Sequence, residues 1–260
     1  MIFELLLSPA FAWVAAAVFL GGFMRGFVGF GGAVVSIPVL SIAFGPLTAV
    51  PIAAVMAFPA LFQLLPDAIR YGDKHFIGPV SVGVLGAAPI GCLVLVSSDP
   101  YLMKIAISLL VLLTVALLAR NWRLPGRLNP ALLLGVGAVG GIIQGAAGMG
   151  GPPAVAMALA RAGSATQQRG NVLGVMTTMS FSSLFPLWYF DLFTREAMLI
   201  GVILLPVYSG SAWLGARRFS QDGERYYRRV ALGILAAIGT ITLILATHDY
   251  LTIGGGATPR

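Results

Sequence analysis

The most constraining feature of this sequence is a set of six glycines that occurs twice. The two sets, related by one constant offset, are Gly21, Gly22, Gly26, Gly29, Gly31 and Gly32, and then Gly140, Gly141, Gly145, Gly148, Gly150 and Gly151. Even in a chain with 33 glycines, this agreement indicates an internal duplication. One position between them differs in charge, because Arg25 in the first copy aligns with Gln144 in the second.

The composition indicates that the duplication lies in a membrane. Of the 260 residues, 58% are hydrophobic and only 10% are charged, and the mean hydropathy is +0.93. These values are typical of integral membrane proteins. We therefore expect residues 1–260 to form one integral membrane domain that is all-α and polytopic, with the lipid bilayer as its surroundings. The net charge is +7, and most of the basic residues lie in short loops between apolar segments. This distribution indicates how the protein is oriented in the bilayer, and we expect no nucleic-acid partner.

Ten apolar segments, five in each copy, predict the helices. They fall near 9–24, 33–44, 47–66, 77–97, 102–119, 131–146, 152–161, 170–189, 197–216 and 229–247. Segments 33–44 and 152–161 are too short to cross a hydrocarbon core of about 30 Å, which takes about 20 helical residues. Each is expected to be a half-helix that pairs with the preceding segment across a glycine-rich break.

Each copy is thus predicted to be a glycine-broken helix hairpin plus three transmembrane helices. Repeat 1 covers about 9–119 and repeat 2 about 131–247, with a cytoplasmic linker at 120–130. The basic residues predict how the repeats are oriented, because most of them lie in the loops 67–76, 120–130, 161–169 and 217–229. By the positive-inside rule these loops are cytoplasmic.

The chain threads through those loops only if each hairpin enters and leaves on the same side, so the two repeats are inverted relative to each other. This arrangement is typical of secondary transporters, whose broken helices meet near the bilayer midplane at the substrate site. It predicts a multi-pass protein of the bacterial cytoplasmic (inner) membrane with both termini extracytoplasmic. The alternative is a parallel duplication with eight ordinary spans, which would place one basic loop outside.

The glycine cores within the repeated sets are the first candidate binding elements. Irregular backbone at membrane depth needs partners for its polar groups, and a helix that starts there offers free N–H groups to an anion. The predicted binding residues are Gly29, Gly31, Gly32 and Ala33 in the first copy, and Gly148, Gly150 and Gly151 in the second. Close helix packing is the alternative, and it is the favoured explanation for Gly22 with Gly26 and for Gly141 with Gly145.

Arg25 is the sharpest single candidate. An arginine near the bilayer centre costs at least about 2.5 to 3.5 kcal/mol, so it should face a cavity or a partner. The acidic residues all fall near span ends or in loops. The missing counter-ion is therefore predicted to be an anionic substrate, which a planar guanidinium can bind through two hydrogen bonds. The alternative is that Arg25 caps the carbonyls of its own helix or reaches the surface.

Two further polar residues complete the predicted binding set. Gln144 occupies the position equivalent to Arg25 and can donate a hydrogen bond without adding charge. Asn171 lies on span 170–189 beside several hydroxyl residues, some of which are expected to line the path. Cys92 is alone, and neither histidine has metal-ligand company, so we expect no catalytic residue, no metal and no cofactor.

The glycine motifs resemble those of the TauE/SafE family of sulfite and sulfonate exporters. The resemblance rests on Gly-Phe-Gly-Gly at 29–32 followed by Pro38, on Gly-Met-Gly-Gly-Pro-Pro at 148–153, and on the chain length. It implies a membrane permease for a small oxyanion such as sulfite, a sulfonate such as sulfoacetate, thiosulfate or a related organic acid. Arg25 is not part of that family pattern, so its role rests on the physical argument above.

A second class of function competes with the permease. A membrane-embedded enzyme that acts on an anionic lipid-linked substrate could also use Arg25 as an anion clamp. That class needs a nucleophile or general base beside Arg25, and the sequence offers no buried His, Asp or Glu there. The sequence leaves homo-oligomerisation open.

Overall fold

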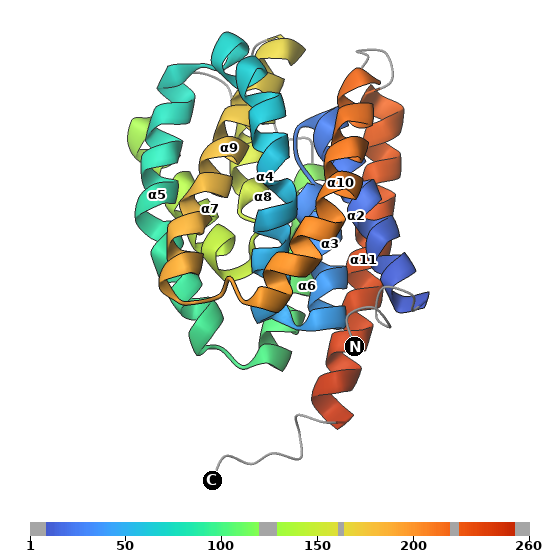
Figure 1. Ribbon diagram of the computed structural model, residues 1–260. Helices are drawn as coiled ribbons and strands as arrows, with labels where there is room; N and C mark the ends of the chain where they lie inside the picture. The colour runs from blue at the N-terminus through green and yellow to red at the C-terminus, as the bar shows by residue number, and fades with distance from the viewer. Residues whose placement is uncertain (1–8, 120–128, 161–163, 219–223, 253–260) are drawn as a thin grey trace.

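The computed structural model describes residues 9–119, 129–160, 164–218 and 224–252, and within these ranges the chain is helical with no strand (Figure 1). The helices are α2 (Pro9–Val28), α3 (Gly32–Phe44), α4 (Pro46–Tyr71), α5 (Lys74–Ser97), α6 (Pro100–Ala119), α7 (Pro130–Ala147), α8 (Gly151–Ala160), α9 (Ala165–Tyr189), α10 (Arg195–Arg217) and α11 (Glu224–Thr252). The predicted all-α, polytopic fold is confirmed, and each apolar segment of the sequence corresponds to one helix.

Several helices extend beyond the apolar segments that predicted them. The expected loop 67–76 is wrong for most of its length, because α4 continues to Tyr71 and α5 already starts at Lys74. The Asp73 side chain makes this tight turn possible, since its carboxylate accepts the His75 N–H at 2.9 Å and caps α5. Hydropathy detects the lipid-facing part of a helix and misses such polar ends. Residues 120–128 of the predicted linker 120–130 lie outside the described residues.

By length and composition, four described helices can cross a membrane. They are Lys74–Ser97, Pro100–Leu117, Pro130–Ala147 and Arg195–Arg217. A fifth is counted if α4 is one span, in which Pro46–Pro59 and Leu61–Tyr71 meet at 66°. Helix α7 was expected to be the first half of a broken hairpin, yet its 18 residues pass the same test, whereas α3 has only 13. The inverted orientation of the repeats stays a prediction.

The helices pack in pairs that combine the two copies of the duplication. Helix α2 packs along α10, α7 along α5, α4 against α9, and α6 along α11 (Figure 1). The repeated glycines make these contacts close. A Cβ on Gly26 would overlap the backbone of Ala212 in α10, and a Cβ on Gly145 would overlap the backbone of Ala88 in α5. These glycines therefore act as packing residues, as expected from the sequence.

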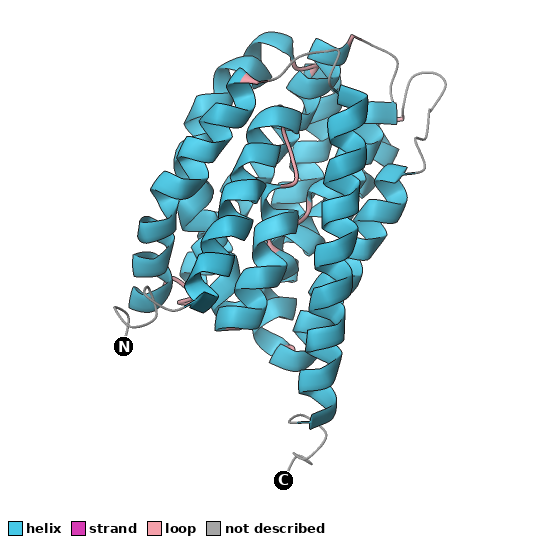
Figure 2. Cartoon of the chain, turned by 90° about the vertical axis from the view of Figure 1, so that its right-hand side faces the viewer, coloured by secondary structure: helices cyan, strands magenta, loops and turns pink. Residues whose placement is uncertain are grey.

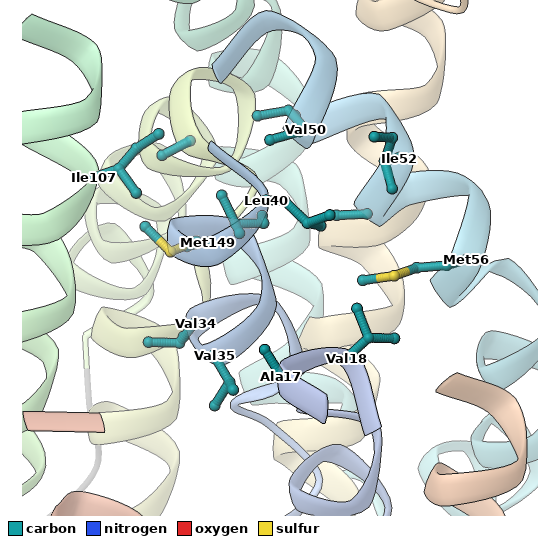
Figure 3. Close-up of a cluster of buried hydrophobic side chains, with 14 of the residues drawn as sticks. Ala17, Val18, Val34, Val35, Leu40, Val50, Ile52, Met56, Ile107 and Met149 are labelled. Carbon is teal, nitrogen blue, oxygen red and sulfur yellow. The ribbon is translucent and has the colours of Figure 1, made fainter. Parts of the chain in front are cut away.

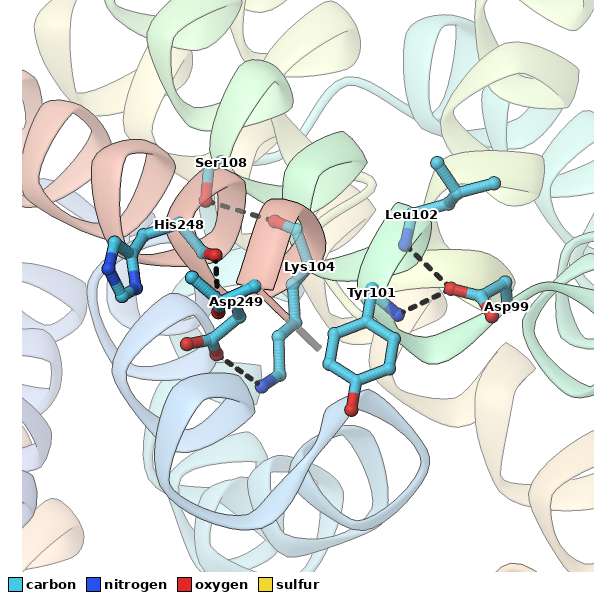
Figure 4. A network of polar contacts seen from close by, with 8 residues as sticks. Asp99, Tyr101, Leu102, Lys104, Ser108, His248 and Asp249 are labelled. Carbon is cyan, nitrogen blue, oxygen red and sulfur yellow. Dashed lines mark hydrogen bonds and ion pairs between the residues drawn. The ribbon is translucent and has the colours of Figure 1, made fainter. Parts of the chain in front are cut away.

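Polar contacts fasten α6 to α11 at one end of this pair (Figure 4). Lys104 Nζ lies 3.1 Å from the carboxylate of Asp249, and Ser108 donates a hydrogen bond to Thr242 at 3.1 Å. Asp99 caps the start of α6 by accepting the N–H groups of Tyr101 and Leu102. These contacts lie apart from the glycine breaks, so we assign them to the scaffold.

The breaks themselves lie inside the molecule. Figure 2 shows short loops midway along the bundle, where long helices would otherwise continue. Around them, Met149 of the second break packs in one apolar cluster with Val34 and Leu40 of α3 and with Val50 of α4 (Figure 3). The two halves of the sequence therefore share a core at the place where each copy leaves helical geometry.

Candidate functional site

The first break joins the last turn of α2 to the start of α3. Gly29 and Gly31 have φ angles of 93° and 95°, in the left-handed region that side chains other than glycine rarely adopt. The Gly29 N–H donates to the Arg25 carbonyl at 2.8 Å and ends α2. Arg25 is thereby held in the last turn of the helix, directly before the break.

The second break repeats this geometry at its first glycine, whereas Gly150, the counterpart of Gly31, has no positive φ. Gly148 has a φ of 66° and ends α7, and its N–H donates to the Gln144 carbonyl at 2.8 Å. The Gln144 side chain then turns onto the break: its Oε1 accepts the Gly150 N–H at 3.0 Å, and its Nε2 donates to Ser183 Oγ at 3.4 Å. The second break therefore satisfies its own backbone with a side chain.

The two half-helices that follow the breaks offer different numbers of hydrogen-bond donors. Helix α3 starts at Gly32, and its cap residue Gly31 provides no side-chain hydrogen bond. The first N–H groups of a helix have no partner within the helix, so those of Gly32, Ala33 and Val34 point out of its end. Helix α8 starts Gly151-Pro152-Pro153, and the two prolines have no N–H at all. Donors for an anion are concentrated at the first break.

Both breaks open onto the same cavity, which has a volume of about 60 Å³. A water molecule needs about 10–15 Å³ by this measure, so the cavity has room for several waters or for a small anion. Its lining comes from the breaks, α4, α9 and α10: Arg25, Phe30, Gly31, Gly32, Ala33, Val34, Val50, Ala53, Ala54, Met56, Ala57, Leu61, Gln144, Gly148, Met149, Gly151, Pro152, Met176, Met179, Ser180, Ser183, Leu184 and Tyr208.

Arg25 is the one charged side chain among these lining residues. Only 6% of its surface is exposed, and its Nε is buried without a hydrogen-bond partner. Within the described part of the chain no carboxylate pairs with its guanidinium. A buried cation without a partner is costly, so this arrangement favours binding of an anion in the cavity.

Tyr208 is a lining residue that the sequence did not single out. It is fully buried in α10, and its hydroxyl lies against Gly32, since a Cβ on that glycine would overlap the Tyr208 oxygen. The hydroxyl is thus close to the start of α3 and to Arg25. A tyrosine in the middle of an apolar span, two residues after Pro206, was the available signal.

The structure brings together most of the predicted binding residues. Those that line the cavity are Arg25, Gly31, Gly32, Ala33, Gln144, Gly148 and Gly151. Gly29 and Gly150 shape the breaks without lining the cavity. Asn171 lies elsewhere, because its Oδ1 accepts the Asp73 N–H at 2.7 Å beside the turn between α4 and α5. Ser180 and Ser183 of the same span do line the cavity, and both also donate to carbonyls of their own helix.

A second arginine supports the first break from outside the cavity. Arg169, near the start of α9, forms an ion pair with Asp67 of α4 at 2.8 Å. Its Nη2 donates to the Gly26 carbonyl at 3.3 Å, in the last turn of α2. The sequence assigned Arg169 only to a basic loop, whereas it joins three helices next to Arg25.

No group of three or more His, Cys, Asp or Glu residues that could hold a metal ion occurs in the part of the chain that the structure describes. The polar lining, which consists of one guanidinium, amide, hydroxyl and backbone N–H groups, is suited to an anion.

Comparison with known proteins identifies the family. The model of the family described as sulfite exporter TauE/SafE matches residues 14–241. The chain belongs to this family. A curated relative from Cupriavidus necator, named probable sulfite/organosulfonate exporter TauE, is 27% identical over 217 residues, which cover 77% of this chain and 82% of the relative. No solved structure matches the chain. As a member of the TauE/SafE family, the protein is a multi-pass membrane transporter.

Proposed function

We propose that this transporter moves a small oxyanion, of the sulfite or organosulfonate type, and binds it in the cavity between the two glycine breaks. The observation that carries the proposal is the buried guanidinium of Arg25, which lines the cavity and has no protein counter-ion among the described residues. The name of the Cupriavidus necator relative supports the substrate type.

The groups around Arg25 suit the shape of an oxyanion. The guanidinium can donate two parallel hydrogen bonds to two oxygens of a sulfonate or sulfite group. The free N–H groups of Gly32 and Ala33 provide further donors at the positive end of α3. The Tyr208 hydroxyl, from α10, lies beside the same helix start. Together these groups surround the first break on the side of the cavity.

Movement of the substrate is proposed to follow from an inverted repeat. Helix α2 of the first copy packs on α10 of the second, and α7 of the second packs on α5 of the first. Such an exchange of equivalent partners is what a twofold relation between two copies produces, and the basic loops favour inverted over parallel copies. Rocking of one repeat against the other around a fixed site would then expose the cavity to each side in turn. We place the protein in the bacterial cytoplasmic membrane, with both termini outside.

The competing enzyme function has less support. Acid–base or nucleophilic chemistry on a lipid-linked substrate needs a positioned carboxylate, imidazole or activated nucleophile. The described lining residues provide an arginine, a glutamine, two serines and a tyrosine, with no Asp, Glu or His. Ser180 and Ser183 donate to main-chain carbonyls and have no base beside them.

Replacement of Arg25 by glutamine tests the proposal. This change gives the first break the residue that the second already has. Loss of a charged hydrogen-bond partner costs about 1.5–3 kcal/mol, so we expect sulfite and methanesulfonate uptake into proteoliposomes to fall about tenfold to a hundredfold. Arg70→Gln, which changes an exposed arginine at the end of α4, is the matched control and should transport like wild type. Unchanged uptake by folded Arg25→Gln protein would show that the anion does not bind at this arginine.

A further inference from the structure

We propose that the cavity accepts monoanions and rejects dianions. The substrates are then bisulfite and short alkanesulfonates. The dianions sulfate, thiosulfate and sulfoacetate are excluded. This inference rests on the proposed function and narrows it. It follows from the number of charges at the site and from the walls of the cavity.

The charged groups around the cavity add up to one positive charge. Arg25 is the one ionised side chain in the lining that the structure describes, and Gln144 at the equivalent position is neutral. The other nearby arginine, Arg169, is paired with Asp67 at 2.8 Å, so that pair adds no net charge. An anion with one negative charge would leave the site neutral.

The helix ends at the breaks do not change this count. The start of a helix carries about half a positive charge and its end about half a negative charge. Each break places both kinds of end together: α2 ends where α3 starts, and α7 ends where α8 starts. The half-charges therefore oppose each other, and the N–H groups of α3 act on an anion through short-range hydrogen bonds.

A dianion would keep one negative charge without a partner in a mostly apolar chamber. The α4 side of the cavity consists of Val50, Ala53, Ala54, Met56, Ala57 and Leu61, and Met176 and Met179 of α9 complete it. None of these side chains can stabilise a charge, and an unpaired buried charge is strongly disfavoured. The same wall suits the methyl group of a short alkanesulfonate, whose sulfonate would lie on Arg25.

If the cavity accepts only monoanions, sulfite transport depends on pH, because the charge of sulfite changes with pH. Sulfite carries one negative charge in mildly acidic solution and two in mildly alkaline solution, whereas methanesulfonate carries one in both. A monoanion site would carry sulfite as bisulfite, together with its proton. This also agrees with the lack of a carboxylate in the described lining that could carry a proton itself.

The test uses full-length wild-type protein in liposomes, with uptake of methanesulfonate, sulfite, sulfate and sulfoacetate measured in mildly acidic and mildly alkaline buffer. We expect methanesulfonate uptake to be equal in both buffers and sulfite uptake to fall several-fold in the alkaline one. Sulfate and sulfoacetate uptake should be at least about tenfold slower than that of methanesulfonate. Dianion uptake as fast as methanesulfonate uptake, or sulfite uptake that does not fall, would overturn the inference.

A variant with a second positive charge at the cavity tests whether the number of charges sets the preference for monoanions. Gln144→Arg places a second guanidinium at the equivalent break and should raise the ratio of sulfate to methanesulfonate binding by at least about tenfold. A ratio that stays at the wild-type value in folded protein contradicts the inference. If this variant does not fold, the wild-type uptake comparison decides alone.

Failure of this inference can be told apart from failure of the proposed function. Transport that depends on Arg25 but does not distinguish dianions from monoanions would refute this inference and leave the proposed function standing. Transport that is independent of Arg25 would refute the proposed function.

Discussion

The two glycine breaks end their first helix in the same way and then differ in backbone and in polar groups. In both, a left-handed glycine ends the first helix by donating its N–H to the carbonyl four residues earlier, at 2.8 Å. In the second break, the Gln144 side chain accepts a hydrogen bond from the Gly150 N–H, and Pro152 and Pro153 have no backbone N–H to donate. In the first, Arg25 stays without a protein partner among the described residues. The two copies thus share the glycine that ends the first helix. They differ at Gly31 and Gly150, of which Gly31 alone has a positive φ, and in whether a side chain pairs with the break.

The helices that pack on the breaks differ in the same way. Where α10 meets Gly22 of the first copy it carries Tyr208, whereas α5 meets Gly141 of the second copy with Val84. Of these two contacts, the one with the tyrosine hydroxyl lies beside the break that also carries the charge. The charge and the tyrosine hydroxyl therefore lie at the first break, whereas Gln144 and Ser183 are the polar side chains at the second.

The largest predicted effect concerns what the breaks share. Gly26→Ala and Gly145→Ala should each destabilise the fold by about 3 kcal/mol or more, because the new methyl groups meet backbone atoms of Ala212 and Ala88, which cannot move aside like a flexible side chain. Thermal unfolding in detergent should show both losses. Gly210→Ala, on α10 with open space around it, is the control and should unfold like wild type. A tolerated Gly26→Ala would contradict the close α2–α10 contact.

A smaller effect should separate the two breaks. Gln144→Ala leaves the buried Gly150 N–H without its acceptor, which costs about 1–3 kcal/mol of stability. Methanesulfonate transport per folded molecule should stay within a few-fold of wild type, because the anion is assigned to the other break. Unfolding and uptake measured on the same preparation check both halves of this prediction. If uptake by Gln144→Ala falls as far as uptake by Arg25→Gln, the two breaks share the anion and the contrast between them is wrong.

The smallest predicted effect concerns Tyr208. Tyr208→Phe removes one hydroxyl from the cavity and keeps the ring that packs in the core, so folding should be unaffected. Loss of one neutral hydrogen bond costs about 0.5–1.5 kcal/mol, which corresponds to a weakening of methanesulfonate binding by a few-fold to about tenfold. Titration of the detergent-solubilised protein by calorimetry measures it. An unchanged affinity would remove the hydroxyl from the site and leave Arg25 as its main group.

The features of the molecule that depend on repetition, length and charge could be predicted from the sequence. The glycine offset and the apolar segments predicted the helices and the breaks, and the isolated charge of Arg25 predicted a cavity residue. Gln144 was expected to contact substrate, and it lines the cavity, but the structure also shows it bonded to Gly150 and Ser183. Which hydrogen-bond partners a side chain finds depends on loop geometry, and the sequence pattern does not contain that geometry.

Three-dimensional contacts explain the remaining differences. Asn171 follows the start of α9 by only a few residues, and the close approach of Gly170 to Gly72 brings it to the α4–α5 turn and away from the cavity. Arg169 carried no signal beyond its charge, because its partners Asp67 and Gly26 lie far away in sequence. Tyr208 reaches the site through helix packing between the two copies, which neither hydropathy nor spacing encodes.

The most direct test of the contrast between the breaks is to locate a bound anion. Selenite has the shape and charges of sulfite, and selenium can be located by its anomalous X-ray scattering in crystals of the protein with its ordinary methionines. We predict one anomalous peak in the cavity, within hydrogen-bond distance of the Arg25 guanidinium and the first N–H groups of α3. A peak at the second break beside Gln144 and Gly150, or one outside the cavity, would contradict it.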